Sequence, residues 1–168
     1  AVVADSFHIK PLLRMVQSAD GYQILALSRE ESRLYQGNRD GLHEVELPPE
    51  FPRTPDAVVD TDTRKPQPVR THSTAAGGVH QGTSSRADLS KSDTERFFRA
   101  VDRAVLEQYS RKQQLPLVLL ALPENQGDFR RISRNPLLLE QGLEVSPTAI
   151  SLDELRRRAW TVVEPQYL

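Results

Sequence analysis

The order of hydrophobic and polar positions in the first half of the chain predicts three successive strands. Residues 22–27 form a nearly continuous apolar run, which is typical of a buried central strand. Residues 32–36 and 42–47 are two further short runs, and the Asp40-Gly41 dipeptide between them is a strong hairpin signal. The three segments therefore favour an antiparallel meander.

The second half of the chain adds a long helix and another strand. Ser92 and Glu95 have the spacing of a capping box, and apolar residues follow at helical intervals to about Arg111. Residues 115–122 form the most apolar stretch of the sequence, so we expect a second buried strand there. A helix between two such strands is typical of a parallel crossover.

Shorter helices are expected around this core. Residues 7–17 predict one helix, residues 125–133 predict a second, and residues 135–142 predict a short helical turn closed by glycine. Ser151 and Glu154 form a second capping box, which opens a further helix. In that helix the hydrophobic residues should point inward and the arginines mostly outward (Leu152, Leu155, Ala159 and Trp160; Arg156, Arg157 and Arg158).

These elements predict an α/β fold with a mixed β-sheet, an antiparallel meander and a crossover helix, in a topology compatible with an RNase H-like core. Residues 20–168 would form one domain, and residues 1–19 an N-terminal arm leading from a preceding domain. Nucleases of the RNase H superfamily need carboxylates on the central strand to hold two metal ions. Neither residues 22–27 nor residues 115–122 contain a carboxylate, which argues strongly against a metal-dependent nuclease.

The amino-acid composition of residues 48–91 differs from that of the rest of the chain. This stretch holds half of the chain's 12 prolines and few hydrophobic residues. Uninterrupted loops of such length are uncommon in compact domains and are usually functional or disordered. We therefore expect the folded domain to be interrupted by one long, mobile loop.

The distribution of charge singles out the same stretch. The whole chain has 22 basic and 23 acidic residues, so its net charge of -1 does not suggest a nucleic-acid partner. Residues 61–91 are locally basic, and the helix that follows adds arginines. Such a surface can bind phosphate groups without reading sequence, although it can also be a solvated face. The candidate RNA-contacting residues here are Arg64, Lys65, Arg70, Arg86, Lys91, Arg96 and Arg99.

The loop also contains the most unusual residues of the chain. Gly77-Gly78 frees the backbone to approach a partner closely. His80 could act as a base near neutral pH, and Gln81 offers both amide donors and a carbonyl acceptor. The functional interpretation is a tip that inserts into a partner's site, and the alternative is a disordered connector with incidental glycines.

Little other chemistry is indicated. The chain has no cysteine, which excludes disulfide scaffolds, cysteine zinc sites and thiol nucleophiles. Its four histidines are scattered, so we expect neither a metal ion nor a cofactor. No apolar run approaches membrane-spanning length and no signal segment is present, which predicts a cytoplasmic protein without a membrane partner.

Several short segments occur in a characteristic order along the chain. They are residues 22–28, 33–37 and 41–45, the Gly77-Gly78 loop, and residues 96–102, 116–120, 153–155 and 159–160. Together they resemble the bacterial proteins related to archaeo-eukaryotic class I release factors and Pelota. The resemblance covers the chain from about Phe7 to Tyr167, and it lies in the order of the segments rather than in one diagnostic motif.

The resemblance implies the middle domain of such a protein, with an RNase H-like fold, flanked by neighbouring domains of a longer chain. It implies the ribosome or tRNA as partner. In true release factors the long loop carries Gly-Gly-Gln, whose glutamine helps water attack the peptidyl-tRNA ester. Here two residues separate Gly78 from Gln81, so the motif is not intact. Pelota-type members lack the motif and act as ribosome-binding rescue factors.

Three hypotheses follow. The leading one is a non-catalytic ribosome- or tRNA-associated domain that acts in rescue, stress or dormancy, with Gly77, Gly78 and the basic residues contacting RNA. The second is a peptidyl-tRNA ester hydrolase that uses Gln81, with His80 nearby. The third is a protein-interaction module that has kept only the fold.

Overall fold

The computed structural model describes residues 20–62 and 84–168, and within them one four-stranded sheet. Its strands are β1 (Tyr22–Leu27), β2 (Ser32–Gly37), β3 (Leu42–Glu44) and β4 (Leu117–Leu120). They lie in the order β3-β2-β1-β4, with β4 parallel to β1 and the other neighbours antiparallel. The predicted α/β class, meander and crossover are thereby confirmed. The predicted helix at residues 7–17 lies outside the described residues.

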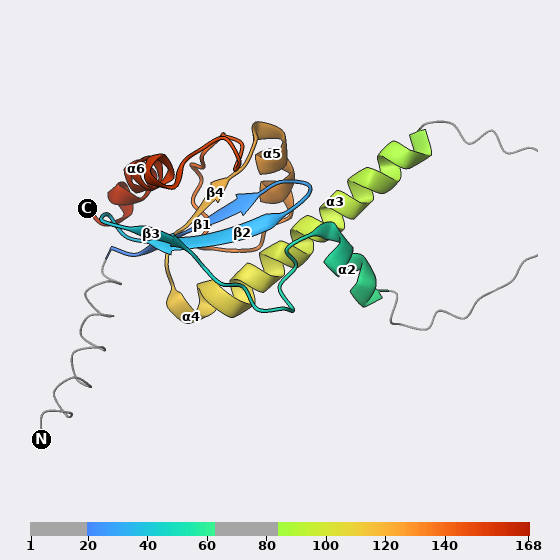
Figure 1. Cartoon of the computed structure of the whole chain (residues 1–168), viewed down its shortest axis with the longest axis horizontal. Helices are drawn as coiled ribbons and strands as arrows, with labels where there is room; N and C mark the ends of the chain where they lie inside the picture. The colour runs from blue at the N-terminus through green and yellow to red at the C-terminus, as the bar shows by residue number, and fades with distance from the viewer. Residues whose placement is uncertain (1–19, 63–83) are drawn as a thin grey trace, which may run out of the picture.

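Helices cover both faces of this sheet (Figure 1). The longest, α3, continues through a π-helical turn into α4, and Gln114 ends this continuous helix in a left-handed conformation with φ 52°. The helical segments are α2 (Pro55–Asp62), α3 (Ser84–Val105), η1 (Leu106–Ser110), α4 (Arg111–Gln113), α5 (Pro123–Ile132), α6 (Leu152–Val163) and η2 (Glu164–Gln166).

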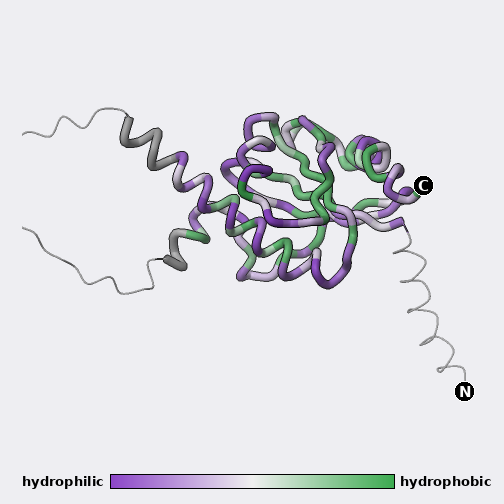
Figure 2. Tube along the Cα trace, turned by 180° about the vertical axis from the view of Figure 1, so that it is seen from behind, coloured by the Kyte–Doolittle hydropathy of each residue, from purple (hydrophilic) through white to green (hydrophobic). Residues whose placement is uncertain are grey.

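The central strands β1 and β4 are buried on both faces because they lie between two hydrophobic clusters. Leu25 and Leu27 of β1 belong to the cluster formed with α3 and α5. Tyr22, Ile24 and Ala26 of the same strand alternate to the other side and pack with α6. Figure 2 shows the hydrophobic residues concentrated where the strands and helices meet. None of the described helices is long and apolar enough to cross a membrane.

The predicted loop at residues 48–91 contains two helical segments, α2 and the start of α3. Pro55 stands at the start of α2, where its missing N–H costs no hydrogen bond, and Asp56 follows in the first turn. At the other end, α3 begins at Ser84 and passes through Ser92 without interruption, so the Ser92–Glu95 capping box does not mark a helix start. The helices α2 and α3 lie against each other, and this contact supports both segments beyond the sheet (Figure 1).

The predicted helical turn at residues 135–142 is wrong over most of its length. One turn is present, in which the Leu138 amide donates to the Asn135 carbonyl at 3.3 Å. The rest of the segment runs alongside β4 instead, through single bridges that join Leu117 to Leu138 and Leu120 to Leu143. The Leu139 amide donates to the Leu117 carbonyl at 2.9 Å, and the Leu143 amide donates to the Leu119 carbonyl at 2.8 Å. The outer edge of β4 would otherwise expose unpaired backbone groups, and this pairing satisfies them.

Two smaller predictions also need correction. β3 ends at Glu44 rather than at residue 47, because the chain leaves the sheet to place Leu47 and Phe51 in the core beside α3. Leu152 was expected to point inward but is 48% exposed, and the buried residues of α6 begin only at Leu155. The cap of this helix is confirmed, because the Ser151 hydroxyl accepts the Glu154 amide at 3.3 Å.

The tight β2–β3 turn gives a first testable prediction. A Cβ atom on Gly37 would collide with the Gly41 carbonyl oxygen and lie 2.9 Å from Leu42 Cα. Because the backbone must move to relieve this contact, we expect Gly37→Ala to lower the free energy of unfolding by about 1–3 kcal/mol in urea denaturation. Gly41→Ala is the matched control, since its Cβ would meet nothing within 4 Å. Equal stability of the two variants would contradict the prediction.

Candidate functional site

The pair of helices α2 and α3 brackets the segment that the sequence singles out. α2 ends at Asp62 and α3 begins at Ser84, and among the described residues these two helices extend away from the sheet (Figure 1). The predicted site residues Arg64, Lys65, Arg70, Gly77, Gly78, His80 and Gln81 fall between these positions and lie outside the described residues.

The remaining predicted basic residues all lie on α3. Arg86 belongs to the first turns of this helix, and Lys91, Arg96 and Arg99 are exposed further along it. Arg99 forms an ion pair with Glu95 one turn earlier, at 2.7 Å. The structure thus places these residues along one helix. Lys91 lines a cleft that neither Arg96 nor Arg99 lines.

That cleft has a volume of about 480 Å³ and lies where the turn after β1 meets α3 and α5. β1 and β4 run parallel, and their carboxyl ends lie next to each other at Ala26 and Leu120. The segments that follow the two strands line the cleft. Arg29 comes from the turn after β1, and α5 follows β4. The lining residues are Arg29, Lys91, Thr94, Glu95, Phe98, Asp128 and Arg131.

The charges of the cleft are mixed, with the cations in excess. Arg131 pairs with Asp128 at 3.4 Å. The Arg99 guanidinium, which donates a hydrogen bond to Glu95, lowers the pKa of that exposed carboxyl, and nearby Arg131 and Lys91 act in the same direction. Both acids therefore have a cationic partner, while the Arg29 Nε atom donates to the neutral Asn125 side chain at 3.4 Å.

A buried network fixes α3 relative to the end of α5. Asp102 of α3 is only 5% exposed, and its carboxylate accepts the Ser133 hydroxyl at 2.6 Å and the Arg134 amide at 2.9 Å. A further hydrogen bond joins neighbouring parts of the same segments. The Asn135 side-chain amide donates to the hydroxyl of Ser110, which belongs to the π-helical turn η1, at 2.8 Å. The two walls of the cleft are thus held by hydrogen bonds as well as by packing.

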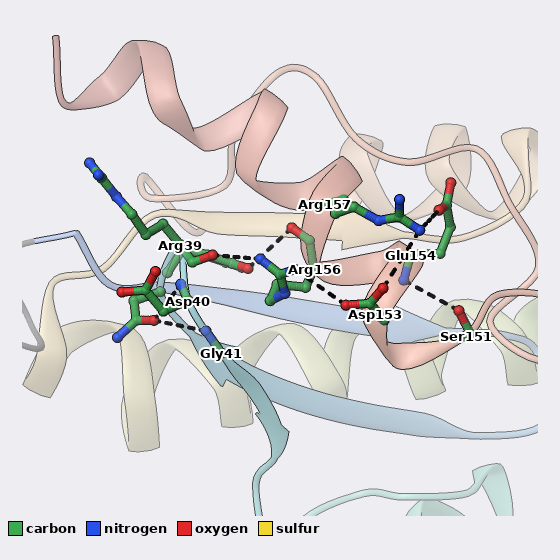
Figure 3. A network of polar contacts seen from close by, with 10 residues as sticks. Arg39, Asp40, Gly41, Ser151, Asp153, Glu154, Arg156 and Arg157 are labelled. Carbon is green, nitrogen blue, oxygen red and sulfur yellow. Dashed lines mark hydrogen bonds and ion pairs between the residues drawn. The ribbon is translucent and has the colours of Figure 1, made fainter.

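The arginine cluster of α6 has a structural role. Arg157 and Arg158 both pair with Glu154 at 2.8 Å (Figure 3 for Arg157). Arg156 pairs with Asp153 at 3.2 Å and donates to the Arg39 carbonyl at 2.6 Å, which ties α6 to the β2–β3 turn (Figure 3).

Trp160 does not offer a free stacking surface. Its ring packs against Tyr22, stacks on Tyr167 with centroids 6.3 Å apart, and has the Arg39 guanidinium 5.5 Å from its centroid.

Sequence reasoning missed Arg29, Asp128 and Arg131. Arg29 stands two residues after a strand that was predicted correctly, and residues just beyond the carboxyl ends of parallel strands often bind ligands. That signal was present in the sequence. Nothing in the spacing of residues 29, 91 and 131 shows that they share one cleft.

Within residues 20–62 and 84–168 no group of three His, Asp or Glu side chains is placed to hold a metal ion.

A second cleft of about 590 Å³ lies beside β2 and β3 and differs in charge. Glu31, Glu44 and Glu46 line it with only two cations, Arg33 and Arg53. Its acidic residues make it a poor surface for a polyanion. We call the side formed by α3, α5 and the turn after β1 the basic side, because cations outnumber acids in its cleft.

Comparison with known proteins gives one family. A family model described as bacterial archaeo-eukaryotic release factor family 3 matches residues 21–168. The match begins one residue before β1 and includes every described strand and helix. No curated protein matches the chain.

Proposed function

Because the chain belongs to bacterial archaeo-eukaryotic release factor family 3, we propose that it acts in translation as a ribosome- or tRNA-associated domain. In this proposal the basic side of the domain and the segment between α2 and α3 contact RNA. The domain does not itself hydrolyse peptidyl-tRNA, and its role is in ribosome rescue, stress or dormancy in the bacterial cytoplasm.

The observation that carries the proposal is the family match over nearly the whole chain, together with the position of α2 and α3. These helices extend away from the sheet and bracket residues 63–83, which contain Gly77-Gly78. Exposed basic residues follow on α3 itself. Cations along a projecting helix suit sequence-independent contact with a phosphate backbone.

The lack of catalysis is proposed from the loop sequence. Gln81 is separated from Gly78 by Val79 and His80, so its side chain would start from a different backbone position than in an intact Gly-Gly-Gln. A displacement of about 1 Å at a reacting group can cost about 100-fold in rate, and two inserted residues allow far more. The RNase H-like classification of the fold is part of the same proposal.

Co-sedimentation of the full-length protein with ribosomes tests the proposal. We expect binding at low salt that weakens at least about tenfold between about 50 and 200 mM salt, because counterions are released when cations neutralise phosphates. Absence of binding at low salt would refute the proposal and favour a protein-interaction module. If the bound protein releases peptide, and Gln81→Ala abolishes the release, the hydrolase alternative is correct.

A further inference from the structure

We propose that the cleft formed by Arg29, Lys91 and Arg131 binds a phosphate group of an RNA backbone. The inference rests on the proposed function, because it assumes an RNA partner and names the side chains that would hold it. Two of the three residues, Arg29 and Arg131, are not among the basic residues that the sequence pattern singles out.

The position of the cleft is the first argument. It lies beyond the carboxyl ends of the parallel strands β1 and β4, where open α/β sheets commonly bind ligands. No carboxylate occurs in either strand, and among the described residues no group of three His, Asp or Glu side chains is placed to hold a metal ion. Cations from the surrounding elements take this place instead, and cations suit an anionic ligand.

The convergence of three elements is the second argument. Arg29 comes from the turn after β1, Lys91 from α3 and Arg131 from α5. All three side chains belong to exposed residues, and no described carboxylate lies within ion-pair distance of Arg29 or Lys91. Guanidinium groups bind phosphate through two parallel hydrogen bonds, and the ammonium group adds a point charge.

The acids of the cleft do not cancel this charge. Glu95 is held by Arg99, which lies outside the lining, and Asp128 is held by Arg131 at 3.4 Å. Exposed pairs of this kind contribute little stability, so Arg131 can turn one N–H toward a phosphate at small cost. With Arg99 included, the four cations outnumber the two carboxylates around the cleft.

The apolar part of the cleft wall strengthens the electrostatic attraction. Phe98 is fully buried and is one of the lining residues, so part of the wall has a low dielectric constant. Thr94 lines the same cleft beside it. A volume of about 480 Å³ accommodates a phosphate and an adjoining sugar, whereas an extended peptide would find no exposed apolar pocket among these lining residues.

The test uses the full-length protein carrying Arg29→Gln and Arg131→Gln together. Arg157→Gln with Arg158→Gln is the matched control, because it removes the same charge from exposed ion-paired side chains on α6. Binding is measured by fluorescence anisotropy with a labelled single-stranded RNA and by ribosome co-sedimentation, over a series of salt concentrations. Thermal unfolding monitored by circular dichroism checks that both variants fold.

We expect the cleft variant to bind at least about tenfold more weakly than wild type, with a salt slope that is smaller by about one for each phosphate it no longer neutralises. The α6 control should stay within about twofold of wild type. Equal weakening of both variants would overturn the cleft assignment while leaving ribosome binding by the wild type, and hence the proposed function, intact. If the wild type binds the labelled RNA more tightly than the cleft variant does, but does not bind ribosomes, the proposed function is refuted and the cleft assignment stands.

Discussion

Replacement of Phe98 by alanine is expected to lower the free energy of unfolding by about 3–5 kcal/mol, as for other fully buried phenylalanines. Phe98 belongs to α3, is 0% exposed and packs toward α5. Its ring makes an edge-on contact with Phe129 of α5, at a centroid distance of 6.2 Å, and lies 6.0 Å from Phe97. The substitution removes these contacts and leaves a cavity that a helix pair fixed by Asp102 can close only in part.

Leu152→Ala provides the comparison for this substitution. Sequence periodicity places Leu152 on the inner face of its helix, but Leu152 is 48% exposed. We therefore expect its replacement to change stability by no more than about 0.5 kcal/mol. Chemical denaturation followed by circular dichroism measures both variants. Similar losses at the two positions would show that the packing between α3 and α5 contributes less than the burial of Phe98 implies.

The parts of the fold that the sequence predicts correctly are those with strong local signals. β1 and β4 are continuous apolar runs because both faces of each strand are covered, and few other structures of that length tolerate such composition. The start of α6 is predicted because a single hydroxyl, that of Ser151, accepts the free amide of Glu154. In each case the residues that determine the structure are neighbours in the chain.

The sequence does not predict those parts of the fold that depend on contacts between residues far apart in the chain. α2 is short and polar, and it packs against α3, which no local pattern reveals. Residues 138–143 run beside β4 because the edge of that strand needs hydrogen-bonding partners, although a short apolar run closed by glycine also fits a helical turn. The cleft is the extreme case, since Arg29, Lys91 and Arg131 meet only after the crossover has brought β4 beside β1.

The second large effect is expected at Asp102, for a different physical reason. Its buried carboxylate accepts hydrogen bonds from the Ser133 hydroxyl and from the Arg134 amide. Asp102→Ala removes both acceptors and leaves two donors without their partner. Since hydrogen bonds to a charged group are each worth about 1.5–3 kcal/mol, we expect a loss of about 2–4 kcal/mol after relaxation and entry of water.

Asp93→Ala is the matched control, because Asp93 lies on the same helix but is exposed. Its replacement should change stability by no more than about 0.5 kcal/mol. Asp102→Asn keeps one carbonyl acceptor and should fall between the two. Hydrogen exchange separates this role from simple packing, because removal of the acceptor should speed exchange at the Arg134 amide more than at amides of β1. An Arg134 amide that exchanges at the wild-type rate in Asp102→Ala would show that the carboxylate does not hold the end of α5, and that packing and the Asn135–Ser110 hydrogen bond join the two walls of the cleft.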